Sequence, residues 1–135
     1  MRSGGINWLA VVAAAVAIYA LGFVIYGLLL PAETWMAWSG VSAKDIEAVG
    51  SSRMPFSPVM PLMTAIFMAV IFKWAQVAGA SDGAKWGAVV ALASAVPALM
   101  YGWVYGIGPA EMTLVDSGHL LLGHVAAGAV LGAWK

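Results

Sequence analysis

Three ionisable residues gather near the C-terminal end of a chain that has few of them elsewhere. Asp116, His119 and His124 lie in the segment DSGHLLLGH, which runs directly into the apolar segment VAAGAVLGAW. Carboxylate and imidazole groups can exchange protons, hydrogen-bond a solute or ligate a metal ion. Ionisable groups within an apolar span are costly unless they are paired or hydrated, so these three residues are the first candidates for a functional site.

Helical geometry predicts that the three side chains share one broad face. At about 100° per residue, His119 lies about 60° to one side of Asp116, and His124 lies about 80° to the other side. Gly128 and Gly132 follow at four-residue steps on nearly the same stripe, and small residues at this spacing let two helices approach closely. We therefore expect this face to point into protein and not into lipid.

Asp116 and His124 lie at different depths in the membrane, so their roles are interpreted separately. With a rise of about 1.5 Å per residue, Asp116 lies near the outer edge of the span and His124 lies close to the membrane midplane. For Asp116, interfacial solvation or charge complementarity with a helix N-terminus is the favoured interpretation. For His124, two interpretations stay open: a protonatable functional group, or a neutral imidazole that hydrogen-bonds to a neighbouring helix.

The spacing of the two histidines argues against a metal site, and the absence of catalytic motifs argues against an enzyme. His119 and His124 are about 140° apart, which is a poor arrangement for one ion, although Asp116 and His119 form a workable i,i+3 pair. The chain has no cysteine, and its eight methionines are better explained by packing. We find no nucleophilic triad, phosphate-binding loop or paired carboxylates, so we predict no metal, no cofactor and no catalytic residue, and we favour a non-enzymatic role.

The composition places the chain in a membrane. Of its 135 residues, 63% are hydrophobic and 9% are charged, whereas soluble domains carry about 25% charged residues. Six basic and six acidic residues cancel, and no basic cluster is present. The composition therefore predicts an integral membrane protein whose partner is the lipid bilayer, and it excludes a nucleic-acid-binding role.

Four segments are long and apolar enough to span a bilayer: residues 6–30, 55–78, 85–107 and 112–134. We predict an all-α integral membrane protein with a single domain, a four-transmembrane-helix bundle. Six tryptophans lie near the predicted span ends, where amphipathic rings favour the headgroup zone. The capping pattern from Ser42 to Asp45 predicts a short interfacial helix in the first outer loop, with Gly50 as its stop.

The distribution of basic residues predicts the orientation. Arg2, Lys73, Lys85 and Lys135 fall on the side that holds both termini, whereas Lys44 and Arg53 fall on the other side. Because lysine and arginine concentrate on the cytoplasmic side, we expect both termini in the cytoplasm and the protein in the inner (cytoplasmic) membrane.

Aromatic and small residues on the other spans allow two interpretations. The aromatic stripes could line a ligand cavity near His119, or they could be core packing, and both stay open; they include Tyr26, Tyr101 and Tyr105. The pairs Gly102–Gly106 and Gly128–Gly132 have the spacing of helix-packing motifs. Several such faces on so small a chain favour a homo-oligomer or association with other membrane subunits.

Elements at both ends of the chain resemble a known family. They are Asn7-Trp-Leu-Ala, Gly22, Tyr26-Gly27, Trp35-Met-Ala, Gly40-Val-Ser-Ala-Lys-Asp-Ile, Leu114-Val-Asp-Ser-Gly-His-Leu and Gly128-Ala-Val-Leu-Gly-Ala-Trp. Over essentially its whole length, the chain resembles the bacterial membrane family catalogued as domain of unknown function 1761.

The resemblance implies a four-span fold but no settled activity, and it adds weight to Asn7, Tyr26, Asp116 and His119 as matched positions. The family often has a tyrosine before the histidine that corresponds to His119, where this chain has Gly118. It also commonly has a proline soon after the Tyr-Gly element, where here Pro31 comes four residues later.

Two functions follow as hypotheses. The first is a membrane protein that binds or translocates a small solute, ion or proton at an Asp/His site on the fourth span. The alternative is an accessory or structural subunit of a larger membrane complex, in which the histidines only bond neighbouring helices.

Overall fold

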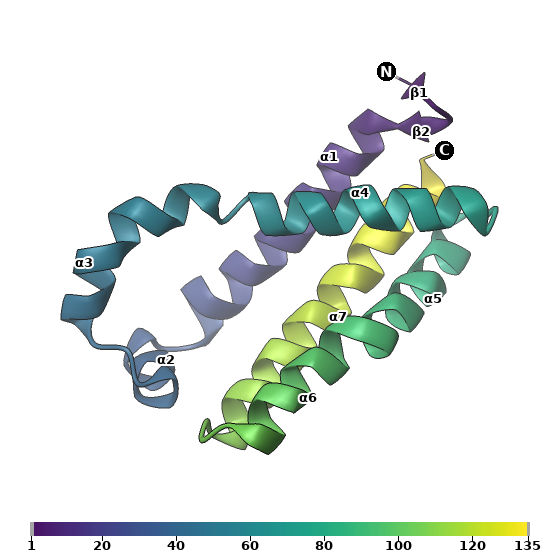
Figure 1. Cartoon of the computed structure of the whole chain (residues 1–135). Helices are drawn as coiled ribbons and strands as arrows, with labels where there is room; N and C mark the ends of the chain where they lie inside the picture. Colours follow the sequence, from purple (N-terminus) through teal and green to yellow (C-terminus); the bar gives the residue numbers. More distant parts are fainter. Residues whose placement is uncertain (1, 135) are drawn as a thin grey trace.

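The computed structural model describes residues 2–134 as a short β-hairpin followed by a series of helices (Figure 1). The elements are, in order, β1 (Arg2–Ser3), β2 (Ile6–Asn7), α1 (Trp8–Gly22), the π-helix η1 (Phe23–Leu29), α2 (Ala32–Ser39), α3 (Ala43–Arg53), the 3-10 helix η2 (Met54–Phe56), α4 (Val59–Trp74), α5 (Ala80–Val90), the π-helix η3 (Ala91–Ala95), α6 (Val96–Tyr105) and α7 (Ala110–Ala133).

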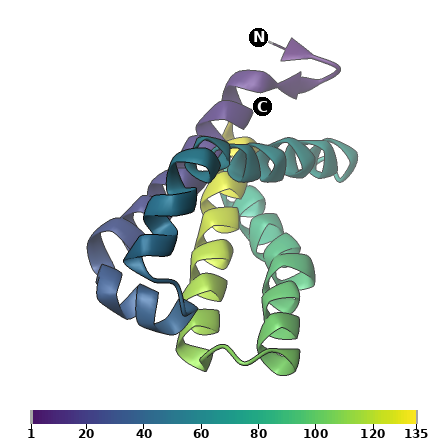
Figure 2. The ribbon, with the colours of Figure 1, turned by 60° about the vertical axis from the view of Figure 1, so that its left-hand side comes forward.

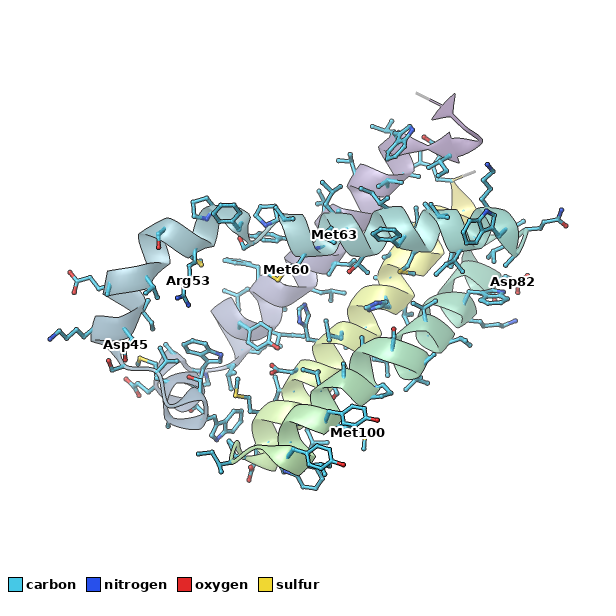
Figure 3. The ribbon with its side chains drawn as sticks, in the orientation of Figure 1. Asp45, Arg53, Met60, Met63, Asp82 and Met100 are labelled. Atoms are coloured by element: carbon cyan, nitrogen blue, oxygen red, sulfur yellow. The ribbon has the colours of Figure 1, made fainter. Side chains whose placement is uncertain are left out.

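Four helical stretches are long and apolar enough to cross a membrane: Trp8–Leu29, Met54–Trp74, Ala80–Tyr105 and Ala110–Ala133. The predicted all-α fold with four membrane-spanning helices is therefore confirmed. The charged side chains Asp45 on α3 and Asp82 on α5 lie at opposite extremes of the molecule (Figure 3). The protein is a multi-pass membrane protein.

The first span begins later than the sequence suggested because a hairpin precedes it. Ser3 pairs with Ile6 across a two-residue turn, and Gly4 and Gly5 have φ angles of 59° and 76°. A turn with positive φ at both central residues matches the twist of a hairpin and favours glycine. Asn7 then caps α1, its side chain accepting a hydrogen bond from the Leu9 amide at 3.2 Å.

The buried core lies where α1, α4 and α7 meet, and α4 crosses the other two at an incline (Figures 1 and 2). Small side chains dominate it, so the helices approach closely. The buried residues of this cluster are Ala10, Val11, Ala14, Ala15, Ile18, Ala65, Met68, Ala69, Phe72, Val77, Ala127 and Leu131.

Helix α5 packs on α7 with the two backbones in direct contact. A Cβ atom added at Gly83 would overlap the carbonyl oxygen of Gly128, and one added at Gly128 would overlap the carbonyl oxygen of Gly83. At the end of the contact, the Gly79 amide donates to the Gly132 carbonyl at 2.8 Å. Glycine is required on both helices because any side chain would separate them.

The helices lose regularity at three places along the spans. The first span widens into η1, where the Leu30 amide bonds to the carbonyl of Ile25, five residues back. The third span widens into η3, which ends two residues before Pro97. At the start of the second span, the 3-10 helix η2 precedes α4, so the α-helix begins at Val59, four residues after the predicted start at residue 55.

The loop between the first two spans is more helical than expected, because it contains both α2 and α3. Helix α3 is the predicted interfacial helix, and Ser42 and Asp45 form a reciprocal capping box at its start. Hydrogen bonds from the Ser42 side chain and backbone lower the pKa of Asp45, because they stabilise its charged form. The helix continues past Gly50, the expected stop, and ends at Arg53.

We predict that Gly83→Ala destabilises the protein by about 2 kcal/mol or more, because the new methyl group has no room against α7 and the helices must move apart. The matched control is Gly102→Ala on α6, where an added Cβ meets nothing within 4 Å. That change should be neutral or slightly stabilising, since alanine is the better helix former. Unfolding in detergent followed by tryptophan fluorescence measures both, and equal effects would contradict the packing described.

Candidate functional site

The last turns of the first span meet α7 at a cluster of three polar side chains. The Tyr26 hydroxyl donates to Asp116 Oδ1 at 2.5 Å. The Tyr26 ring lies edge-on to the His119 imidazole, with ring centroids 5.2 Å apart and planes at 89°. The structure thus brings together three of the residues that the sequence singled out, and Tyr26 joins the carboxylate to the imidazole.

Gly22 makes room for the His119 imidazole. A Cβ atom at position 22 would lie 3.0 Å from His119 Nε2 and 3.3 Å from Cε1. One turn further along, Gly123 of α7 faces Ile18 of α1. The two helices therefore interlock, with a small residue on each opposite a large one on the other.

His119 Nε2 is buried and has no hydrogen-bond partner among the described residues. A buried polar atom without a partner costs about 1–3 kcal/mol, so native structures seldom keep one without a reason. The nitrogen lies against Gly22, and both residues line a neighbouring cavity. The imidazole therefore has unused hydrogen-bonding capacity beside this cavity.

The cavity has a volume of about 420 Å³ and lies between the first span, the start of the second and the middle of α7. Tyr19 and Ser57 share a hydrogen bond of 3.1 Å across it. Most of the remaining wall is apolar. The lining residues are Ile18, Tyr19, Gly22, Phe23, Tyr26, Gly27, Met54, Ser57, Met60, Pro61, Thr64, His119, Leu120 and His124.

His124 is the deepest polar residue of the site, with 7% of its surface exposed. Its Nδ1 lies 2.7 Å from the Leu120 carbonyl oxygen, one turn back on the same helix. A carbonyl oxygen can only accept, so Nδ1 carries the proton of this bond. In the neutral ring, Nε2 is then an acceptor. The bond is within α7, so it is not the interhelical bond that the sequence suggested as one alternative.

The other predicted site residues lie elsewhere. Asn7 is at the far end of α1, about 28 Å from Tyr26 at 1.5 Å per residue, and its amide donates to the Trp134 carbonyl at 3.1 Å. Tyr101 and Tyr105 stack on each other on the exposed side of α6, with centroids 6.0 Å apart. None of these three lines the cavity.

The predicted packing glycines divide into two pairs. Gly128 and Gly132 lie in the contact with α5. Gly102 has open space around it, and a Cβ atom at Gly106 would meet only Gly102 of its own helix. In residues 2–134, no three His, Asp or Glu side chains gather in an arrangement that could hold a metal ion.

Sequence reasoning missed two features of the cavity. Gly22 was noted only as part of a family resemblance, yet it is the residue that admits the imidazole. The pair Tyr19 and Ser57 was missed because the residues are 38 positions apart. The signal available for Ser57 was the proline-rich start of the second span, which indicated an irregular wall facing protein or water.

The fold and this site define a multi-pass membrane protein with a small polar cluster at the wall of an apolar cavity. The chain belongs to the family of proteins of unknown function DUF1761, whose profile matches residues 9–132. This confirms the family resemblance drawn from the sequence. No curated protein and no solved structure matches the chain.

We predict that Tyr26→Phe lowers the free energy of unfolding by about 1–3 kcal/mol, because Asp116 loses the hydroxyl that it accepts from. Asp116→Asn should cost less, since its amide oxygen can still accept from Tyr26. Tyr105→Phe is the control, because its exposed hydroxyl makes no hydrogen bond within residues 2–134, and it should change stability by less than about 0.5 kcal/mol. Denaturant titration in mild detergent compares them; similar losses for the two tyrosine variants would exclude a stabilising role for the Tyr26–Asp116 bond.

Proposed function

We propose that this protein binds a small, uncharged and largely apolar molecule within the membrane, in the cavity between the first, second and fourth spans. The observation that carries the proposal is the His119 imidazole, which has an unpaired buried nitrogen and lies at the wall of this cavity. A ligand that hydrogen-bonds to the imidazole would satisfy the nitrogen that the protein leaves unpaired.

The residues that line the cavity indicate the class of ligand that it would bind. Among the described residues, no lysine or arginine lines the cavity, and the one Asp116 oxygen that Tyr26 contacts accepts its hydrogen bond. An anion would therefore find no countercharge in this wall. Apolar side chains such as Ile18, Phe23 and Met60 favour a hydrocarbon or aromatic body. This pattern suits an uncharged molecule with one polar end.

Gly22 and His119 both line the cavity, so a ligand bound beside Gly22 would lie next to the unpaired Nε2. Tyr26 would hold the ring by its edge-to-face contact, and Asp116 would hold Tyr26. His124 Nε2 offers an acceptor deeper in the same cavity, and the hydroxyls of Tyr19 and Ser57 lie on another part of its wall.

Translocation of a solute or proton is the further part of this hypothesis. A carrier must first bind its solute within the bilayer, so the carrier hypothesis depends on the binding proposed here. His124, the deepest polar residue on α7, is the group that would take up a coupled proton.

The second candidate function is an accessory role, and it is supported by α6. Gly128 and Gly132 are occupied by α5, whereas Gly102 has open space and its neighbours Met100, Trp103 and Val104 are exposed. This face suits a second copy of the chain or another membrane subunit. Purification of a stable oligomer or of a larger partner complex in mild detergent would favour this role.

We predict that 1-naphthol, an uncharged aromatic molecule with one hydroxyl, binds saturably to the full chain in lipid nanodiscs. Gly22→Leu should weaken binding by about tenfold or more, which corresponds to about 1.4 kcal/mol, because the side chain fills the cavity beside His119. Gly102→Leu is the matched control, since it adds the same side chain on an open surface. Binding no greater than in empty nanodiscs, or equal binding by both variants, would contradict the proposal.

We also propose that the protein lies in the inner membrane of a bacterium with both termini in the cytoplasm. The bond between Asn7 and Trp134 supports termini on one side, and Lys73 packs against Gly5 at the same end. The greater number of basic residues at that end supports the cytoplasmic assignment.

Because the chain has no cysteine, single cysteines report the orientation without background. We predict that a membrane-impermeant maleimide labels Ala48→Cys on α3 from outside in spheroplasts. Ser81→Cys, at the start of α5, should be labelled only after the membrane is opened. Both positions are exposed, so the reverse pattern would establish the opposite orientation.

A further inference from the structure

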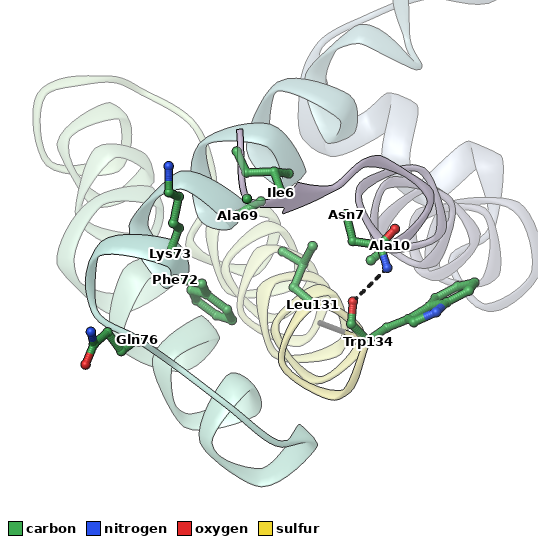
Figure 4. Close-up of a pocket in the computed structure, with 10 residues that line it drawn as sticks. Ile6, Asn7, Ala10, Ala69, Phe72, Lys73, Gln76, Leu131 and Trp134 are labelled. Atoms are coloured by element: carbon green, nitrogen blue, oxygen red, sulfur yellow. Dashed lines mark hydrogen bonds between the residues drawn. The ribbon is translucent and has the colours of Figure 1, made fainter. Parts of the chain in front are cut away.

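A second cavity lies at the end of the molecule that holds both chain termini. Its volume is about 470 Å³, and it shares no residue with the cavity at His119. Figure 4 shows Phe72, Lys73 and Gln76 on one side of the cavity and Asn7 and Trp134 on the other, with Leu131 between them. The lining residues are Gly5, Ile6, Asn7, Ala10, Ala69, Phe72, Lys73, Gln76, Leu131 and Trp134.

Among the described residues that line this cavity, the charged group is the Lys73 ammonium. Lys73 lies across the hairpin turn, with its Cε 3.3 Å from the position that a Cβ atom of Gly5 would occupy. In the part of the chain that the structure describes, no acidic side chain lines the cavity and Lys73 forms no ion pair. Its charge is therefore open to an anionic ligand, whereas Lys85 at the same end pairs with Asp82 at 3.4 Å.

Two residues with amide side chains, Asn7 and Gln76, line the same cavity as Lys73. Gln76 follows the end of α4 with a φ of 53°, a left-handed conformation that glycine or asparagine usually takes at this position. Across the cavity, Asn7 donates one amide hydrogen to the Trp134 carbonyl, which leaves its second hydrogen available. The cavity thus has hydrogen-bond donors and one positive charge at its mouth.

The apolar part of the wall indicates where the ligand comes from. Trp8, Trp74 and Trp134 lie at the ends of three spans on this side, which is the level of the lipid headgroups. Below Lys73, the wall consists of Phe72, Leu131 and small alanines. A free anion would gain nothing from this apolar wall, whereas a lipid would place its acyl chains against it.

We propose that this cavity binds the headgroup of an anionic phospholipid, with the phosphate at the Lys73 ammonium and the first acyl carbons along Phe72 and Leu131. The Lys73 ammonium favours an anionic lipid over a zwitterionic one, because the choline group of phosphatidylcholine already neutralises the phosphate of that lipid. Binding here would hold α4, α7 and the N-terminal hairpin at the membrane surface.

Native mass spectrometry of the full chain in detergent tests this proposal with dioleoyl phosphatidylglycerol and dioleoyl phosphatidylcholine as probes. Lys73→Gln should weaken the first phosphatidylglycerol binding step by about fivefold, the effect of one lysine near an anionic headgroup. Its phosphatidylcholine binding should not change. Lys73→Arg should keep the preference, because it keeps the charge at the same place.

Lys85→Gln is the matched control, since it removes one positive charge at the same end of the molecule but outside the cavity. It should leave phosphatidylglycerol binding unchanged. An equal loss in this control, an unchanged Lys73→Gln variant, or equal affinity of the parent for both lipids would overturn the proposal. Displacement of the lipid by inorganic phosphate at the same concentration would also overturn it, because the site would then be a simple anion site.

Discussion

The contact between the backbones of α5 and α7 is the constraint on which the rest of the structure depends. It occupies the glycine face of α7 at Gly128 and Gly132, and the Gly79 amide fixes its register at one end. A helix held along one face must present its other faces elsewhere. Toward its N-terminal half, α7 therefore presents His119 and Asp116 to the first span.

The cavity at His119 exists because the helices around it stop being regular there. Where α1 and α4 are regular α-helices, alanines such as Ala14 and Ala65 let them pack without space between them. Beyond Ile18 the first span widens into the π-helix η1, and the second span begins with a 3-10 turn and two prolines. Such wide turns often accompany functional sites. The same three spans therefore form a closely packed core in one half and a cavity in the other, where the backbone is irregular.

Composition and segment length were sufficient to predict the four spans, and local capping chemistry was sufficient to predict α3. Helical spacing on α7 correctly predicted that Asp116 and His119 face protein. It also placed Gly128 and Gly132 on nearly the same stripe, whereas these glycines pack on α5 and the two ionisable residues contact the first span. The helices that pack against each face of α7 were not predictable. Tyr26 was noted as one of a stripe of aromatics, and apart from the family resemblance no pattern separates it from Tyr101, which lies on the exposed side of α6. Whether a tyrosine is buried or exposed depends on which helices are neighbours. Helix α5 packs beside α7 through backbone contacts, and the only trace of such contacts in the sequence is glycine.

An imidazole with an unpaired buried nitrogen can persist only if the surrounding structure holds it. The unpaired nitrogen of His119 costs about 1–3 kcal/mol of stability. Two contacts that do not involve His119 hold α7 in place: the glycine contact with α5 and the alanine-rich core that α7 shares with α1 and α4. His124 shows the alternative available to a histidine on the same helix, since its Nδ1 bonds to the carbonyl one turn back. His119 makes no such bond, and its unpaired nitrogen lies against Gly22, where only a residue without a side chain leaves room for the ring. Gly22 thus leaves space for His119 where a larger residue would pack, and this space together with the unused bonding capacity of Nε2 is what supports the proposed binding role.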